Sequence, residues 1–100
     1  MTEHRLISTP LADLDVTTTF EWYENERVGL GVEFTNELRG TYDRIAEGPA
    51  KYQRLRSGIR RALLHRFPYG VYFAVEGDVI VVLAVLHASR DPAEWQHRKV

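Results

Sequence analysis

The sequence predicts an α+β domain whose elements follow the order β-α-α-β-β-β, with a short helix near the C-terminus. Two observations support this fold class. Residues 10–47 contain two amphipathic stretches with helical periodicity, whereas residues 59–87 form three apolar, strand-like runs separated by tight turns. Because two apolar helix stripes can cover an apolar sheet, we expect a helical hairpin packed on one face of that sheet.

The chain opens with a predicted short strand at His4–Ser8 and a first helix that extends from Pro10 to Arg27. Proline lacks a backbone donor and has a fixed φ, so it suits the first turn of a helix. Apolar residues then recur at spacings of four, four and three, which indicates a single stripe along this helix. The stripe consists of Ala12, Val16, Phe20 and Tyr23.

A second helix is predicted from Val32 to Glu47, after a break at Gly29-Leu30-Gly31. The break is short, so the two helices should form an antiparallel hairpin. The second helix ends at Gly48-Pro49, and a basic connector is expected from Ala50 to Gly58. The apolar stripe of this helix consists of Phe34, Leu38, Tyr42 and Ile45.

Three strands follow the connector. The first begins at Ile59 and ends at a Pro/Gly turn, Phe67–Gly70. The second, Val71–Val75, is β-branched and aromatic, and a Gly-containing turn at 76–78 joins it to the third, Val79–Leu86. The unbroken apolar character of the third strand predicts that it is covered on both faces. Beyond it, a capping aspartate and a proline predict a short helix anchored by Trp95.

Composition limits the class of protein. One hundred residues without cysteine predict one domain, residues 1–100, with no disulfide framework and no thiol chemistry. The N-terminus lacks the apolar core of a signal peptide, and the longest apolar run is too short to cross a bilayer, so we expect a cytoplasmic protein that does not enter a membrane. The net charge of −1 hides an asymmetry, because residues 1–50 carry ten acidic and four basic side chains and residues 51–100 carry four and nine.

Common cofactor and metal motifs are absent from the sequence. Gly29-Leu30-Gly31 lies between two predicted helices and is therefore a turn, not a phosphate-binding loop. The four histidines show no i,i+4 pairing on a helix and have no cysteine partners, so neither a metal nor a cofactor is predicted. No serine stands in a nucleophile elbow.

What remains is a set of basic side chains in the second half of the chain. Strand alternation places Arg60 and Arg66 on one face, and Arg61 and His65 on the other. Such a surface could hold a phosphodiester backbone or the acidic side of a protein inhibitor, or its arginines could simply protect a sheet edge. His87 is the one group suited to proton transfer near neutral pH, but no partner acid or base is evident. The set comprises Arg54, Arg56, Arg60, Arg61, Arg66, His87 and Arg90.

Six strings along the chain resemble the ParE/RelE superfamily of toxins from bacterial type II toxin–antitoxin systems. They occur in order, with compatible spacing, and cover the chain from about Pro10 to Arg98. The strings are Phe20-Glu21-Trp22-Tyr23-Glu24; Gly29-Leu30-Gly31 followed by Phe34; Arg44–Glu47 before Pro49; Arg60–Tyr69; Val82–His87; and Arg90-Asp91-Pro92 with Trp95.

This resemblance implies a fold in which a helical hairpin packs on a mainly antiparallel, twisted sheet. It also implies a protein partner, a short cognate antitoxin whose arm wraps the toxin, so that the two form a hetero-oligomer. For the antitoxin contact we expect a groove lined by Tyr42, Ile45, Arg66 and Phe73.

The superfamily contains two activities. RelE-like members cut mRNA on the ribosome, and ParE-like members poison DNA gyrase without being nucleases. This chain has no tyrosine at or after the end of its last strand, and its strings look most like ParE. The gyrase-directed function is therefore favoured. The alternatives are an mRNA endonuclease with Arg61, His87 and Arg90 as catalytic candidates, and an antitoxin-binding module that has lost toxicity. The candidate target-binding residues are Arg60, Arg61, Arg66, His87, Arg90 and Trp95.

Overall fold

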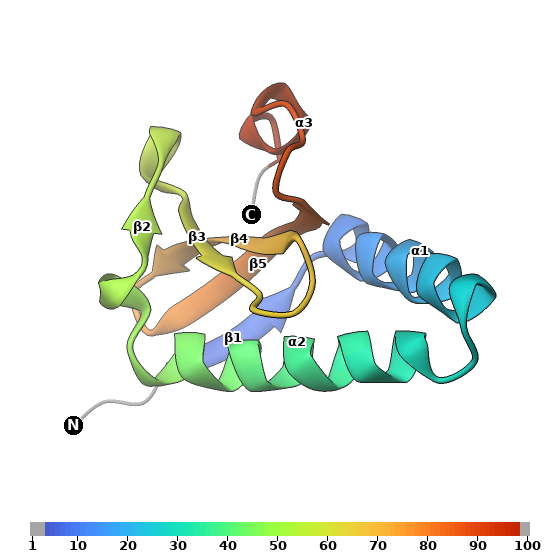
Figure 1. The fold of residues 1–100 in the computed structure, drawn as a ribbon. Coiled ribbons are helices and arrows are strands. Elements are labelled where there is room, and N and C mark those ends of the chain that lie inside the picture. Colours follow the sequence, from blue (N-terminus) through green and yellow to red (C-terminus); the bar gives the residue numbers. More distant parts are fainter. Residues whose placement is uncertain (1–3, 99–100) are drawn as a thin grey trace.

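The computed structural model describes residues 4–98, and it confirms the α+β fold class (Figure 1). In this view α2 runs below the sheet, α1 lies to its right, and the short helix α3 stands above it. The elements in chain order are β1 (Arg5–Ser8), α1 (Pro10–Glu26), α2 (Leu30–Glu47), η1 (Pro49–Lys51), β2 (Gln53–Arg54), η2 (Arg56–Gly58), β3 (Arg60–Leu63), β4 (Tyr69–Glu76), β5 (Val79–His87) and α3 (Ala93–Gln96).

The sheet is mainly antiparallel, as expected. Its strand order is β1-β5-β4-β3-β2, and among the described strands only the β1–β5 pair is parallel. The helical hairpin carries the chain from β1 at one edge of the sheet to β2 at the other. Packing of that hairpin on one sheet face is confirmed. The main core between the two layers contains Phe34, Leu38, Ile45, Phe73 and Val82.

A second, smaller core lies on the other face of the sheet, beneath α3. It joins Tyr72 and Leu83 to Ile59 and Trp95. Burial of β5 on both faces is therefore confirmed, because residues Ile80 to Leu86 are all buried. Within the residues that the structure describes, no helix combines the length and the apolar character that crossing a bilayer requires.

A β-bulge interrupts the pairing of β4 with β5. Tyr72 pairs with Ala84 and Phe73 pairs with Val82, so Leu83 is an extra residue without a partner on β4. The bulge shifts the alternation of the strand. Val82 and Val85 consequently face the helices, whereas Leu83 and Ala84 both face the smaller core.

The expected connector at residues 50–58 is in fact part of a hairpin. Gln53–Arg54 form a short edge strand that pairs with Arg60 and Arg61. Ser57 and Gly58 both have positive φ, 60° and 75°, and the Ile59 N–H donates to the Arg56 carbonyl at 3.1 Å. These are the features of a two-residue type I′ turn. A strand of two residues is too short to show alternation, so the sequence pattern did not predict it.

The strand that begins near Ile59 is shorter than expected. It ends at Leu63, and the following loop is held by α2, because the Glu37 carboxylate accepts the backbone N–H of His65 and, at 3.2 Å, that of Arg66. The loop breaks the alternation, so the expectation that Arg66 shares a strand face with Arg60 was wrong. Phe67 turns into the main core instead.

Candidate functional site

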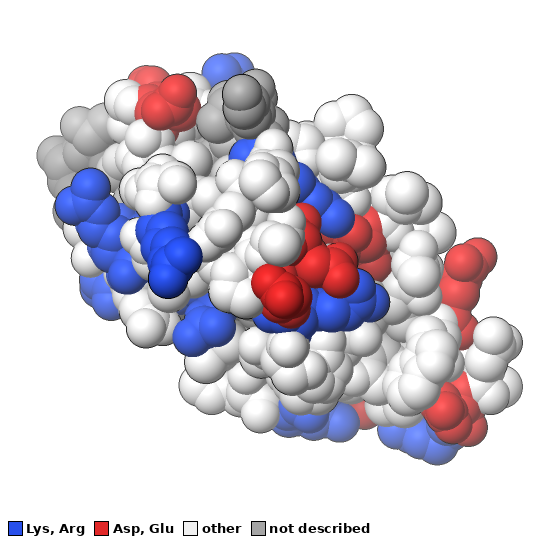
Figure 2. Space-filling model, turned by 90° about the horizontal axis from the view of Figure 1, so that it is seen from above, with Lys and Arg blue, Asp and Glu red and all other residues white. Residues whose placement is uncertain are grey.

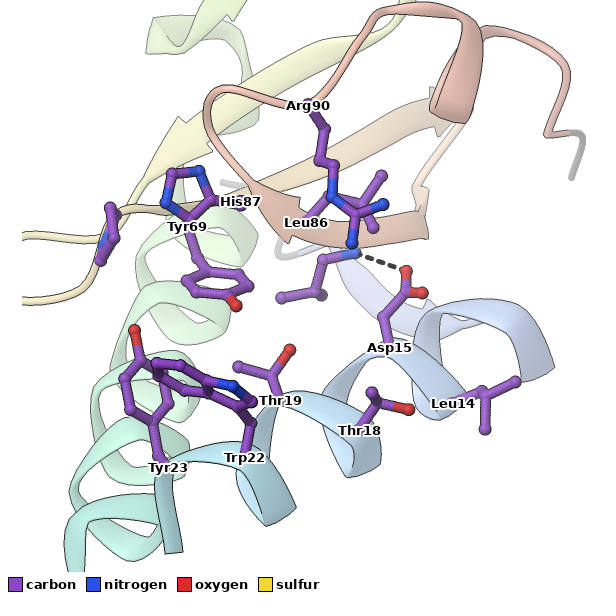
Figure 3. Close-up of a pocket in the computed structure, with 12 residues that line it drawn as sticks. Leu14, Asp15, Thr18, Thr19, Trp22, Tyr23, Tyr69, Leu86, His87 and Arg90 are labelled. Atoms are coloured by element: carbon purple, nitrogen blue, oxygen red, sulfur yellow. Dashed lines mark hydrogen bonds between the residues drawn. The ribbon is translucent and has the colours of Figure 1, made fainter. Parts of the chain in front are cut away.

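A groove of about 580 Å³ runs between α1 and the C-terminal half of β5 (Figure 3). α1 forms one wall, and the end of β5 forms the other with the turn that enters β4 and the loop that follows β5. The α1 wall consists of Leu14, Asp15, Thr18, Thr19, Trp22 and Tyr23. The opposite side consists of Pro68, Tyr69, Val85, Leu86, His87 and Arg90.

Aromatic rings line one end of this groove. The Tyr69 ring lies between His87 on one side and Trp22 and Tyr23 of α1 on the other (Figure 3). Ring centroids are 6.0 Å apart for Tyr23 and Tyr69 and 5.1 Å apart for Trp22 and Tyr23. Burial, with a smaller contribution from the Tyr69 phenol, raises the pKa of Tyr23. Tyr23 therefore stays neutral at physiological pH and acts as a packing residue.

Asp15 hydrogen-bonds the backbone of β5 beyond the point where the pairing with β1 ends. The β1 pairing ends at Val82, and beyond it the Asp15 carboxylate accepts the Val85 N–H at 3.0 Å. Arg98 donates to the same carboxylate at 2.6 Å and to the carbonyl of the bulged Leu83 at 3.0 Å. The Asp15 and Arg98 side chains are only 13% and 17% exposed. This pair therefore neutralises the one carboxylate that lines the groove.

His87 stands at the rim of the groove with a defined tautomer. Its Nδ1 accepts the Ser89 backbone N–H at 3.1 Å and lies 2.8 Å from the Ser89 hydroxyl. An accepting Nδ1 is unprotonated, so a neutral His87 carries its proton on Nε2. The ring also packs edge-on against Tyr69, with centroids 5.4 Å apart. In this arrangement the free nitrogen is a hydrogen-bond donor and not a base.

Two of the six candidate target-binding residues share the groove, and four do not. His87 and Arg90 line it, although Arg90 is also engaged with Glu94 at 2.9 Å. Arg66 lies beside α2, where it pairs with Glu33 at 2.7 Å. The Arg66 and Arg27 guanidiniums hold the pKa of Glu33 below its usual range. Trp95 is buried on the opposite sheet face.

The remaining two candidates lie at the edge of the sheet that is farthest from the groove. Arg60 lies on the helix-covered face with Ala62 and donates to the Tyr52 carbonyl at 2.8 Å. Arg61 donates to the Gln53 side chain at 2.9 Å. Strand order separates them from His87, because β4 and β3 lie between that edge and β5. The basic residues therefore do not form a single site with His87.

The groove expected at Tyr42, Ile45, Arg66 and Phe73 is not formed in the isolated chain. Ile45 and Phe73 have no exposed surface and belong to the main core. Burial, followed by the charges of Asp13 and Asp15, raises the pKa of Tyr42 to about 12. Ile45 and Phe73 lie on facing surfaces of helix and sheet that pack against each other, so they cannot also line an open groove.

The outer face of α1 carries exposed apolar side chains that were not among the predicted site residues. Leu11, Leu14 and Trp22 are 52%, 59% and 56% exposed. They continue the groove wall along the helix, opposite the stripe that faces the core. Their spacings of three and eight residues place these side chains on one side of a helix, but they lie outside the stripe of Ala12, Val16, Phe20 and Tyr23 from which the helix was predicted. Within residues 4–98, no cluster of three or more metal-ligating side chains occurs.

Comparison with known proteins agrees with this fold. A model of the family described as "ParE toxin of type II toxin-antitoxin system, parDE" matches residues 6–92. A chain of the "Chromosomal ParDE TA system from P. aeruginosa" superposes with a TM-score of 0.77 and 18% sequence identity, covering 85% of this chain and 96% of that one. A search of curated protein sequences finds no match. Because the family match spans most of the sequence, the chain belongs to the ParE toxin family.

Proposed function

We propose that this protein is the growth-inhibiting toxin of a type II toxin–antitoxin pair, that it acts on DNA gyrase, and that a cognate antitoxin neutralises it by docking in the α1–β5 groove. Membership of the ParE family supports the toxin role. The structural neighbour is described as part of a ParDE system, which pairs a toxin with an antitoxin. The observation that carries the proposal is the groove, whose α1 wall leaves Leu14 and Trp22 more than half exposed.

The shape of the groove suits a helical peptide arm. From Leu11 to Trp22, α1 extends about 17 Å at 1.5 Å per residue, which is about three helical turns. An amphipathic helix that lies beside α1 could bury Leu14 and Trp22 with its own apolar residues at i, i+3/i+4 and i+7. In a β-strand the N–H and C=O of one residue point to the same side. The Val85 N–H points towards Asp15 of α1, so the Val85 carbonyl points to the same side. That carbonyl can accept a hydrogen bond from a bound arm.

The chemistry of the groove favours a binding protein over a nuclease. Cleavage of RNA through its 2′-hydroxyl needs a general base and a general acid within reach. His87 presents a protonated Nε2, Asp15 is neutralised by Arg98, and Arg90 is paired with Glu94. A toxin that works by docking on gyrase requires none of these groups to titrate.

The decisive experiment is a gyrase assay with purified, antitoxin-free protein, supercoiled plasmid and ATP. We expect linear DNA to accumulate and supercoiling to be lost, and we expect the antitoxin encoded beside the toxin to reverse both effects. The His87→Ala variant should keep full potency, because the proposed action involves no proton transfer. Unchanged gyrase products at saturating toxin, together with cuts in translated mRNA that His87→Ala abolishes, would establish the endonuclease alternative instead.

Antitoxin docking is tested with two exposed apolar side chains of similar accessibility. Leu14 lines the groove and is 59% exposed, whereas Val32 on α2 lies outside it and is 49% exposed. Leu14→Glu should weaken antitoxin binding at least about 30-fold, because a charge would be buried at the centre of an apolar contact. Val32→Glu should change the dissociation constant less than threefold in the same titration. Equal effects of the two variants would exclude the groove as the docking site.

Growth measurements separate an active toxin from a module that only binds antitoxin. Expression of the chain alone should arrest growth, and co-expression of the antitoxin should restore it. Normal growth at an intracellular level that saturates the antitoxin would contradict the toxin role.

A further inference from the structure

A stretch of the chain with uncompensated positive charge forms the sheet edge that is farthest from the groove. Residues 51–75 contain six basic side chains and no acidic one. Five of the six lie on or beside the β2–β3 hairpin, and we call this set the basic hairpin. Figure 2 shows Lys and Arg side chains gathered towards the left of the molecule, the side on which β2 lies in Figure 1. The basic hairpin consists of Lys51, Arg54, Arg56, Arg60 and Arg61.

Elsewhere in the described chain, four of the seven arginines lie beside carboxylates. Arg27 and Arg66 pair with Glu33, Arg90 pairs with Glu94, and Arg98 pairs with Asp15. In the basic hairpin the contacts go to neutral oxygens. Arg60 donates to the carbonyls of Tyr52 and Ala50, and Arg61 donates to the Gln53 amide oxygen. Hydrogen bonds of this kind hold the guanidiniums in place without cancelling their charge.

The backbone of the basic hairpin is also held in a defined conformation. Its type I′ turn at Ser57–Gly58 fixes the register of two short strands, and the Leu55 N–H donates to the Ile59 carbonyl at 2.6 Å. Arg54 and Arg56 are exposed on either side of Leu55, which packs inwards against the smaller core. On the α3 side, Arg54 and Arg56 face a hollow of about 550 Å³ whose other wall contains Asp91.

The side chains around these cations identify the kind of partner. A stable protein interface needs a desolvated apolar centre, and none of the exposed large apolar residues of the described chain lies between residues 51 and 61. The nearest one, Leu63, stands at the opposite end of β3. Single-stranded nucleic acids are bound by stacking on exposed aromatic rings. Here Tyr52 packs on Phe73, and Tyr72 and Trp95 are buried. A duplex phosphate backbone requires only positioned cations.

We propose that the basic hairpin binds the phosphate backbone of duplex DNA without reading its sequence. Arginine predominates in the set, and its planar fork matches phosphate oxygens better than the lysine ammonium does. The proposal concerns DNA alone. It does not require gyrase to be the target, and it concerns a surface separate from the antitoxin groove.

Backbone binding has a characteristic dependence on salt. Each phosphate contact contributes about −0.9 to the slope of log K against log salt. Three contacts therefore predict a slope of about −3 and an affinity about 40-fold lower at 200 mM than at 50 mM salt. Binding should be equal for unrelated duplex sequences of the same length.

The test is a fluorescence-anisotropy titration of the full chain, free of antitoxin, with a labelled 20-base-pair duplex. Arg54→Gln/Arg56→Gln should weaken binding at least tenfold and reduce the salt slope by about 2. The matched control is Arg5→Gln/Arg39→Gln, which removes the same charge from exposed arginines on β1 and α2 and should change the affinity less than twofold. Matching urea midpoints for all variants would show that folding is intact.

Three results would overturn the proposal. The first is the absence of salt-dependent duplex binding at 50 mM salt and tens of micromolar protein. The second is an equal loss of affinity in both double variants, which would mean that net charge and not the hairpin is responsible. The third is tighter binding of a 20-nucleotide single-stranded RNA or DNA than of the duplex, which would identify a different class of nucleic acid.

Discussion

Gly31 determines how closely α1 and α2 approach each other. A Cβ atom at this position would lie 2.7 Å from the Phe20 carbonyl oxygen and 2.8 Å from Cγ of Glu24. The Gly31 N–H also donates to the Glu24 carboxylate at 2.8 Å, which satisfies one free donor at the start of α2. Because backbone stands in the way, Gly31→Ala must push the helices apart. We expect it to lower the free energy of unfolding by about 1–3 kcal/mol in urea denaturation.

Gly40, on the same helix, provides the control. A Cβ atom there would come no closer than 3.4 Å, to the mobile end of the Arg44 side chain. Gly40→Ala should therefore gain helix propensity and raise the free energy of unfolding by up to about 1 kcal/mol. The two substitutions are chemically identical and should have opposite signs. Equal effects would mean that the close helix contact is not required for stability.

We expect the folded protein to lose stability at alkaline pH because of Tyr42. Burial raises its pKa to about 12 from the ordinary value of 10.0. A folded-state pKa above the unfolded one contributes stability that is complete below pH 10 and is lost as the pH rises through 12. One pKa unit corresponds to about 1.4 kcal/mol, so about that amount should already be lost at pH 11. Urea denaturation at pH 8 and pH 11 should show this extra loss in the native chain relative to Tyr42→Phe. Equal losses in both proteins would contradict the assignment.

A residue was placed correctly when its position depended on the sequence next to it, and not when it depended on contacts with distant residues. Placing His87 at the end of the last strand needed only the apolar run that precedes it, and the strand does end at His87. The sequence around Asp15, in contrast, does not indicate the role of this residue. Its partners, Val85 and Arg98, lie 70 and 83 residues away, and no spacing rule connects positions so distant. The grouping of Arg60, Arg61 and Arg66 with His87 failed because it treated neighbours in sequence as neighbours in space.

At the scale of elements, the Asp15–Arg98 pair joins α1 to the uncovered edge of β5 and to the segment after α3. Asp15→Ala would leave the Val85 N–H without an acceptor and the largely buried Arg98 with only the Leu83 carbonyl and no opposite charge. We expect a loss of about 2–4 kcal/mol in the free energy of unfolding. Arg98→Ala should cost less, because the carboxylate still accepts the Val85 N–H. The double variant should be less destabilised than the sum of the two, which urea denaturation of all four proteins would measure. Strict additivity would show that the two side chains do not interact.

Elements with sustained periodicity were predicted well, and short ones were not. α1 and α2 each repeat an apolar stripe over about three turns, and β5 is apolar over eight consecutive residues. β2 has two residues and no pattern. β3 was predicted to continue to the turn at Phe67–Gly70 but ends at Leu63, for a different reason. Leu64 to Phe67 continue the apolar–polar mixture of a strand, but Glu37 of α2 binds the backbone there and holds it as a loop.

At the scale of the whole molecule, β4 and β5 are shared between two cores. Their helix-facing residues belong to the core under α1 and α2, and their opposite residues belong to the smaller core with Trp95. Loss of either core exposes the same two strands. This sharing is the physical basis on which we propose that the chain folds as one cooperative unit, even though α3 contacts only the smaller core through Trp95.

The two tryptophans allow that proposal to be tested. Trp95 is 5% exposed and stacks on Tyr72 with centroids 5.0 Å apart, whereas Trp22 is 56% exposed on α1. In the Trp22→Phe variant, fluorescence therefore reports only on the smaller core, and far-UV circular dichroism reports mainly on α1 and α2. We expect both signals to give the same urea midpoint and the same slope, as a two-state transition requires. An earlier fluorescence midpoint would mean that the α3 side unfolds first, and that the C-terminal segment is a separately stable part of the toxin. Coincident transitions would instead mean that any substitution in the smaller core, such as Trp95→Ala, also weakens the α1–β5 groove on the far side of the sheet.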